Sequence, residues 1–135
     1  MAPAVLLLED NEPYRTLIVE VLTLAGFEVC AAPDGRRVSQ ILHERRIDLV
    51  VTDLVMPERD GIETLTELRY SHPQLPVIAI SGDVPMNRDL YLTIAEKLGA
   101  SRVIAKPFKM EQLVAAAREA IVAGNTSVAP HATMR

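Results

Sequence analysis

The sequence predicts an α/β protein in which a doubly wound, five-stranded parallel sheet carries helices on both faces. Short apolar runs alternate five times with stretches of helical periodicity. Parallel neighbours cannot be joined by a tight turn, so each intervening helix would serve as a right-handed crossover. The strand order 2-1-3-4-5 is expected, because the second run ends without a chemically distinctive residue and suits an edge. The other four runs end in polar or charged residues and suit contiguous positions.

The expected strands are short and mostly aliphatic, and they cover Ala4 to Leu8, Phe27 to Ala32, Ile47 to Asp53, Pro76 to Ile80 and Arg102 to Ala105. The third is the most informative. Its continuous Leu and Val residues predict burial on both faces. It stops at Asp53, just before a Pro-Glu-Arg-Asp-Gly turn. This carboxylate is therefore expected at the mouth of the sheet.

Each expected helix has an apolar face at helical spacing. The first should be capped by Asn11, carry Pro13 in its first turn and end at Gly26. Its apolar face comprises Tyr14, Leu17, Ile18, Val21, Leu22 and Ala25. The faces of the later helices comprise Val38, Ile41 and Leu42; Ile62, Leu65 and Leu68; Leu90, Ile94 and Leu98; and Met110, Leu113, Val114, Ala117 and Ile121.

Length and composition indicate one compact domain. The chain has 135 residues, of which 49% are hydrophobic and 24% charged, enough to bury a sizeable core. We expect the domain to cover residues 1–123. Residues 124–135 show no periodicity and are expected to form a flexible tail. With only this tail after the fifth helix, the sequence suggests a stand-alone unit or one excised from a larger protein, without a DNA-binding domain.

Charge and cysteine content disfavour several classes of function. A net charge of -4 without a basic patch disfavours direct binding to nucleic acid or to an acidic membrane. The single cysteine, Cys30, lies in an apolar run and is expected to be a buried structural thiol in a reducing compartment. The sequence lacks an apolar stretch of the roughly 18 residues that span a bilayer, and its start does not resemble a secretory signal. A cytoplasmic location is therefore expected.

Polar side chains follow four of the expected strands. Glu9 and Asp10 follow the first, Asp53 ends the third, Ser81 follows the fourth and Lys106 follows the fifth. These ends should meet at one edge, where open α/β sheets bind ligands. Three crowded carboxylates favour a hard divalent cation, and few protein oxygens with room for water suit Mg²⁺. A carboxylate beside such a cation and a lysine can attack phosphorus, so the chemistry implied is formation of an aspartyl phosphate.

These residues resemble the signature of response-regulator receiver domains in two-component and phosphorelay signalling. The resemblance covers roughly residues 4–122, and it rests on Glu9-Asp10, Asp53 with Pro57 four positions later, Ser81-Gly82 and Lys106-Pro107-Phe108. It implies a flavodoxin-like (βα)5 fold and a phosphoprotein that receives its phosphoryl group from a histidine kinase or histidine phosphotransfer protein. Such a domain switches binding to a downstream protein. It is not an enzyme beyond promoting its own phosphorylation and dephosphorylation.

The resemblance also implies a role for each site residue. Asp53 would be the phosphoacceptor, and Mg²⁺ would be held by Glu9, Asp10, Asp53 and the backbone carbonyl of Val55. The phosphoryl group would contact Ser81 and Lys106, with Gly82 leaving space for the donor. The Lys106–Pro107 peptide bond would be cis, an isomer whose cost proline lowers.

The sequence departs from the family pattern at three places. Glu9 stands where Asp is more usual. Val103 stands where an aromatic residue usually moves together with the hydroxyl residue, here Ser81, so this part of the switch lacks its ring. The interval from Ser81 to Gly99 is about three residues longer than expected, which predicts an extended, mobile loop. Switching is therefore expected at Ser81, this loop and the fourth helix.

Three other classes of protein share parts of this pattern. A pseudo-receiver would keep the fold as an interaction module without switching, but the acceptor, acidic pair and lysine are intact. A phosphatase of the haloacid dehalogenase type also uses an Asp nucleophile with Mg²⁺, but it needs a second acid two positions later, where this chain has Val55. A flavodoxin-like flavin carrier binds phosphate at its first loop, and the acidic residues from Glu9 to Glu12 would repel it.

Overall fold

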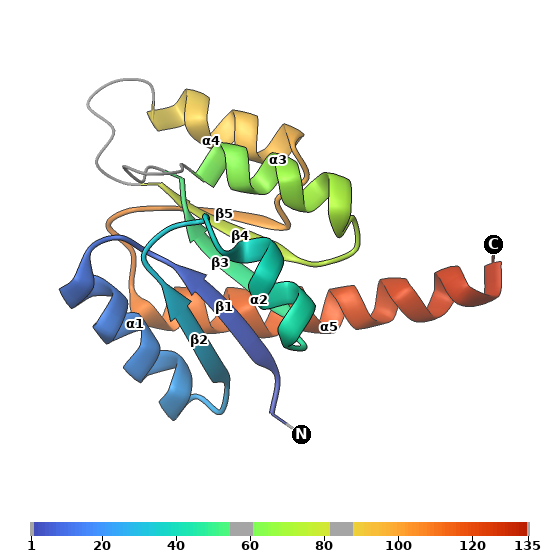
Figure 1. The fold of residues 1–135 in the computed structure, drawn as a ribbon, viewed down its shortest axis with the longest axis horizontal. Helices are drawn as coiled ribbons and strands as arrows, with labels where there is room; N and C mark the ends of the chain where they lie inside the picture. Colours follow the sequence, from blue (N-terminus) through green and yellow to red (C-terminus); the bar gives the residue numbers. More distant parts are fainter. Residues whose placement is uncertain (1, 55–60, 82–87, 135) are drawn as a thin grey trace.

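The computed structural model describes residues 2–54, 61–81 and 88–134 and shows the predicted three-layer α/β arrangement (Figure 1). The sheet is parallel throughout and has the order β2-β1-β3-β4-β5. The strands are β1 Ala4–Leu8, β2 Glu28–Ala32, β3 Leu49–Asp53, β4 Val77–Ser81 and β5 Arg102–Ala105. The helices are α1 Glu12–Leu24, α2 Val38–Glu44, α3 Gly61–Ser71, α4 Arg88–Lys97 and α5 Met110–Met134. The predicted fold class and strand order are confirmed.

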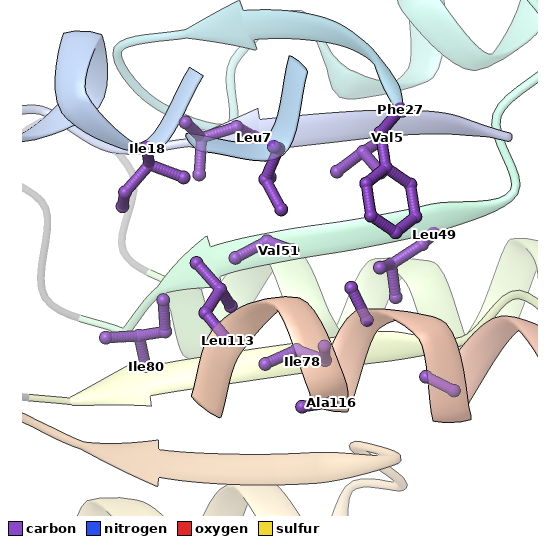
Figure 2. Close-up of a cluster of buried hydrophobic side chains, with 13 residues drawn as sticks. Val5, Leu7, Ile18, Phe27, Leu49, Val51, Ile78, Ile80, Leu113 and Ala116 are labelled. Carbon is purple, nitrogen blue, oxygen red and sulfur yellow. The ribbon is translucent and has the colours of Figure 1, made fainter. Parts of the chain in front are cut away.

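Two hydrophobic clusters hold the helices against the two faces of the sheet. On one face, Val5 and Leu7 of β1 pack with α1 and α5, as Figure 2 shows for the residues around Leu113. On the other face, Leu6 and Leu8 pack with α2, α3 and α4. Successive strand residues point to opposite faces, so both faces are apolar only when a strand is apolar throughout. All five residues of β3 and of β4 are buried, as the continuous apolar runs predict.

The start of α1 is set by its cap. The Asn11 side-chain oxygen accepts a hydrogen bond from the Tyr14 backbone N–H at 2.9 Å, which satisfies one of the free donors of the first turn. Pro13 lies in that turn. At the other end, Gly26 has a φ of 101°, a conformation that glycine adopts without strain. This cap places Tyr14 directly after the acidic loop that follows β1.

Several strand ends differ by one or two residues from the sequence expectations, and two larger differences concern Cys30 and the end of α5. Cys30 is half-buried rather than fully buried, because β2 is an edge strand with exposed positions. Helix α5 continues to Met134, whereas no regular structure was expected from residue 124 (Figure 1). Extending an existing helix requires no new nucleus, so an apolar periodicity is not needed. The domain boundary at residue 123 stays a prediction.

In residues 2–54, 61–81 and 88–134, no helix combines the length and the apolar character that crossing a membrane requires.

Candidate functional site

The parallel register brings the polar residues that follow four strands to one edge of the sheet. Leu8 of β1 pairs with Thr52 of β3, so Glu9 and Asp53 are the next residues of neighbouring strands. Asp53 pairs with Ile80 of β4, which places Ser81 one residue further on. The Lys106 backbone N–H donates to the Ser81 carbonyl at 2.8 Å. The predicted convergence of Glu9, Asp53, Ser81 and Lys106 therefore follows directly from strand pairing.

Lys106 is the cation of this edge. Its Nζ lies 3.2 Å from Asp53 Oδ2 and 3.6 Å from Glu9 Oε1. Burial lowers the pKa of Lys106, but the carboxylates of Asp53 and Glu9 outweigh burial, and the net pKa is raised. The ammonium is therefore charged at neutral pH. The peptide bond from Lys106 to Pro107 is cis.

Three carboxylates form a group that could hold a cation. One oxygen from each of Glu9, Asp10 and Asp53 lies within 4.8 Å of the other two. Glu9 and Asp53 are 1% and 6% exposed, whereas Asp10 is exposed and opens the group to solvent. Three carboxylates against one ammonium leave an excess of negative charge, which a divalent cation would offset. Oxygen ligands with an open side fit Mg²⁺.

Glu9 is the most perturbed of these acids. Its Oε2 accepts from the Asn11 backbone N–H at 3.1 Å, while its buried Oε1 has no hydrogen-bond partner among the described residues and lies 3.6 Å from the Lys106 Nζ. Burial, followed by repulsion from Asp53, raises the pKa of Glu9 to about 7. In the absence of metal, the site therefore takes up a proton as the pH falls through neutrality.

This shift predicts a pH-dependent stability. The folded-state pKa lies above the unfolded value of 4.5, so Glu9 favours the fold at low pH and loses this contribution as pH rises through 7. Without Mg²⁺, raising the pH from 5 to 8 should lower the free energy of unfolding by up to about 3 kcal/mol more in the wild type than in Glu9→Gln. Denaturant unfolding at several pH values measures this difference. Glu28→Gln, at an exposed carboxylate, is the matched control, and an equal pH dependence in Glu9→Gln contradicts the assignment.

Ser81 supplies a hydroxyl without a partner. The residue is fully buried, and its Oγ makes no hydrogen bond to any part of the chain that the structure describes. Buried polar groups in proteins are nearly always paired, so an unpaired hydroxyl at a ligand edge suits a ligand oxygen. Strand pairing places Ser81 one residue beyond the β4 partner of Asp53, and its carbonyl accepts from the Lys106 backbone N–H, but Ser81 does not line the cleft around Asp53.

Two aromatic residues border the site and were not assigned to it from the sequence. The Lys106 Nζ lies 4.5 Å from the centroid of the Tyr14 ring, and Tyr14 meets the Phe108 ring edge to face at 6.2 Å. Tyr14 was assigned to the apolar face of the first helix. The signal that could have found it is its position in the first turn, directly after the acidic loop. Both rings line a cleft of about 790 Å³ together with the carboxylates and Lys106.

Four further residues that the sequence singled out are not among the described residues that line the site. Val55 and Gly82 lie outside the described residues, as does Pro57. Val103 is half-buried and packs against the cluster on the α2, α3 and α4 face. It pairs with Ala79, two residues before Ser81, and does not line the cleft around Asp53.

Fold and site together define a doubly wound α/β domain with an acidic, lysine-bearing pocket at the carboxyl ends of its strands. Residues 5–118 match the response regulator receiver domain family, and the chain belongs to that family. It is 38% identical over 117 residues to the regulatory protein VirG of Agrobacterium tumefaciens (strain 15955), covering 87% of this chain and 43% of VirG. It is 36% identical over 114 residues to the transcriptional regulatory protein CpxR of Escherichia coli (strain K12), covering 84% of this chain and 47% of CpxR.

The solved structures agree. The receiver domain of NtrX from Brucella abortus superposes with a TM-score of 0.80 at 30% identity, covering 87% of this chain and 97% of that domain. The FixJ-N structure gives a TM-score of 0.78 at 31% identity, covering 90% of this chain and 94% of that one. The chain thus matches isolated receiver domains nearly end to end, whereas it spans less than half the length of VirG and CpxR.

Proposed function

We propose that this receiver domain accepts a phosphoryl group on Asp53, with Mg²⁺, from a phosphohistidine of a histidine kinase or histidine phosphotransfer protein in the cytoplasm. The observation that carries the proposal is the Lys106 ammonium 3.2 Å from an Asp53 oxygen, inside a group of three carboxylates. A lysine held against a carboxylate that also belongs to a cation site provides both charges that phosphoryl transfer to an acid requires.

The transfer uses the chain's own groups in defined roles. A carboxylate oxygen of Asp53 attacks phosphorus, an O–P bond forms, and the N–P bond of phosphohistidine breaks with its electron pair going to the imidazole nitrogen. The Lys106 ammonium pairs with a phosphoryl oxygen, and the Ser81 hydroxyl donates to another. Glu9, Asp10 and Asp53, together with the Val55 carbonyl that the family resemblance implies, would hold Mg²⁺. When bound, the ion offsets the negative charge on the phosphoryl oxygens and on these carboxylates.

Removing the metal tests this proposal. Phosphoramidate with Mg²⁺ should add one phosphoryl group per chain, observed as a single mass increment of the intact protein. With Mg²⁺ chelated, the rate should fall at least about 10-fold, because the three carboxylates then repel the donor. Labelling that is equally fast without divalent cation would contradict the proposed role of the acids.

We also propose that phosphorylation switches binding to a downstream protein through Ser81 and helix α4. Val103 is a branched, small residue packed on the α4 side, and it cannot swing between buried and exposed positions as a large ring can. We propose only for this receiver fold that it makes no direct contact with nucleic acid. The chain spans less than half the length of its relatives, and one of these is a transcriptional regulatory protein. A pseudo-receiver would not respond to phosphorylation, so the proposed switch disfavours that alternative.

Hydrogen exchange with and without beryllofluoride, a phosphoryl mimic, measures where the domain responds. Residues 82–95 should show the largest change in amide protection and residues 102–105 a smaller one, because a bond to Ser81 biases the segment that follows it. A maximal response in β5 with none in 82–95 would contradict a switch relocated from Val103. No response anywhere would favour the pseudo-receiver.

A further inference from the structure

The Tyr14 ring contacts Lys106, the lysine of the site. Tyr14 belongs to none of the sequence motifs on which the family resemblance rests. Its ring centroid lies 4.5 Å from the Lys106 Nζ, within the range of a cation–π interaction. Tyr14 is half-buried and Lys106 has a side chain that is only 21% exposed, so the contact is partly shielded from water. Shielding strengthens the attraction between an ammonium and a ring face.

The ring is fixed from two sides. On one side, the Tyr14 backbone N–H donates to the Asn11 cap, which sets where the first turn of α1 lies. On the other side, the Phe108 ring meets it at an interplanar angle of 73°, a favourable edge-to-face geometry. Phe108 follows Lys106 by two residues, so the loop that carries the lysine also supports the ring that the lysine contacts. The aromatic pair therefore joins α1 to the β5–α5 connection.

Lys106 needs such a support because it faces two competing carboxylates. Its Nζ is 3.2 Å from Asp53 and 3.6 Å from Glu9, and a lysine side chain has several freely rotating bonds. Only the position beside Asp53 is useful for a phosphoryl group on that residue. The ring face attracts the ammonium in the position where Nζ lies 3.2 Å from Asp53, and it disfavours the rotamers that carry Nζ out into the cleft.

We propose that Tyr14 is a positioning residue, whose ring face holds the Lys106 ammonium beside Asp53 for phosphoryl transfer. The role in transfer rests on the proposed function, while the contact itself does not. The attraction comes from the ring, so the phenol hydroxyl is not required. Tyr14→Phe therefore keeps the effect, and Tyr14→Leu removes the ring while leaving an apolar side chain.

The contact is tested without phosphorylation by NMR of the Lys106 side chain. A ring face shifts nearby protons upfield, so the ε-methylene and ammonium signals of Lys106 should be upfield of those of other lysines in the wild type and in Tyr14→Phe. In Tyr14→Leu they should return to ordinary values. Unshifted Lys106 signals in the folded wild type would overturn the proposed contact.

The role is tested by the rate of phosphorylation with phosphoramidate and Mg²⁺. Tyr14→Leu should slow it about 3- to 10-fold, and Tyr14→Phe should restore it to within about twofold. Tyr70→Leu, at a tyrosine that is 92% exposed, is the matched control and should leave the rate unchanged. In a Lys106→Ala background, Tyr14→Leu should change the rate less than about twofold, because the group it positions is gone.

The outcomes separate this inference from the proposed function. An equal loss with Tyr14→Leu in both backgrounds, or failure of Tyr14→Phe to restore the rate, would overturn positioning through the ring. Thermal unfolding of each variant identifies a loss of phosphorylation rate that comes from misfolding. If Tyr14→Leu is misfolded, the rate of Tyr14→Phe decides whether the ring positions Lys106. If the wild type shows the upfield shift but accepts no phosphoryl group, the proposed function fails while the contact remains.

Discussion

Asp53→Asn is expected to abolish phosphorylation of the domain, with a rate at least about 100-fold below that of the wild type. The amide has nearly the shape of the carboxylate but lacks the charged oxygen that attacks phosphorus. Asp53 is 6% exposed and its Oδ2 lies 3.2 Å from the Lys106 Nζ, closer than Glu9 Oε1 at 3.6 Å, so we expect no other carboxylate of the site to replace it. Incubation with phosphoramidate and Mg²⁺, followed by intact mass measurement, gives the rate.

Asp34→Asn is the matched control for this substitution. Asp34 is also 6% exposed, and an arginine, Arg36, contacts it with Nε 3.1 Å from Oδ2. It follows β2 at the edge of the sheet and lies outside the acidic group. Its labelling should equal that of the wild type. Labelling of Asp53→Asn at the wild-type rate would contradict the assignment of the acceptor.

Lys106→Ala is expected to slow phosphorylation by about 10²- to 10³-fold, the usual cost of removing one preorganised charge partner of a reacting group. Binding of Mg²⁺ should be unchanged or tighter. The ammonium repels a cation and pairs with two of the three carboxylates that would hold it. The two measurements are the phosphorylation rate at saturating Mg²⁺ and the Mg²⁺ affinity from amide chemical shifts.

Lys97→Ala, at an exposed lysine near the end of α4, is the control for loss of a positive charge. It should alter neither quantity by more than about twofold. If Lys106→Ala lost Mg²⁺ affinity and transfer together, the lysine would be supporting the shape of the site rather than contacting the phosphoryl group.

Much of the fold could be predicted because its signals are local. The Leu and Val run of β3 indicated a strand covered on both faces, and all five residues of β3 are buried, as are those of β4. The polar residue at the end of each central strand then located the edge where Glu9, Asp53 and Lys106 meet, since parallel pairing forces neighbouring strand ends together. Asn11 was expected as a cap and its side chain accepts the expected hydrogen bond.

Other features depend on side-chain packing between distant segments, which periodicity does not encode. Tyr14 has the spacing of a core residue, and only the fold brings it over Lys106, 92 positions away in the sequence by their numbers. The raised pKa of Glu9 depends on how deeply its longer side chain is buried beside Asp53. The continuation of α5 past residue 124 lacks an apolar pattern, because that part of the helix extends beyond the sheet (Figure 1).

The most direct test of the central claim is to identify the residue that carries the phosphoryl group. The protein is phosphorylated with phosphoramidate and Mg²⁺, reduced with borohydride, which converts an aspartyl phosphate to homoserine, and digested for peptide mass spectrometry. The account predicts conversion at Asp53 alone, with Asp10 and Glu9 unchanged. Conversion at another carboxylate with Asp53 unmodified, or a stable phosphoryl group on His131 or another histidine, would contradict it.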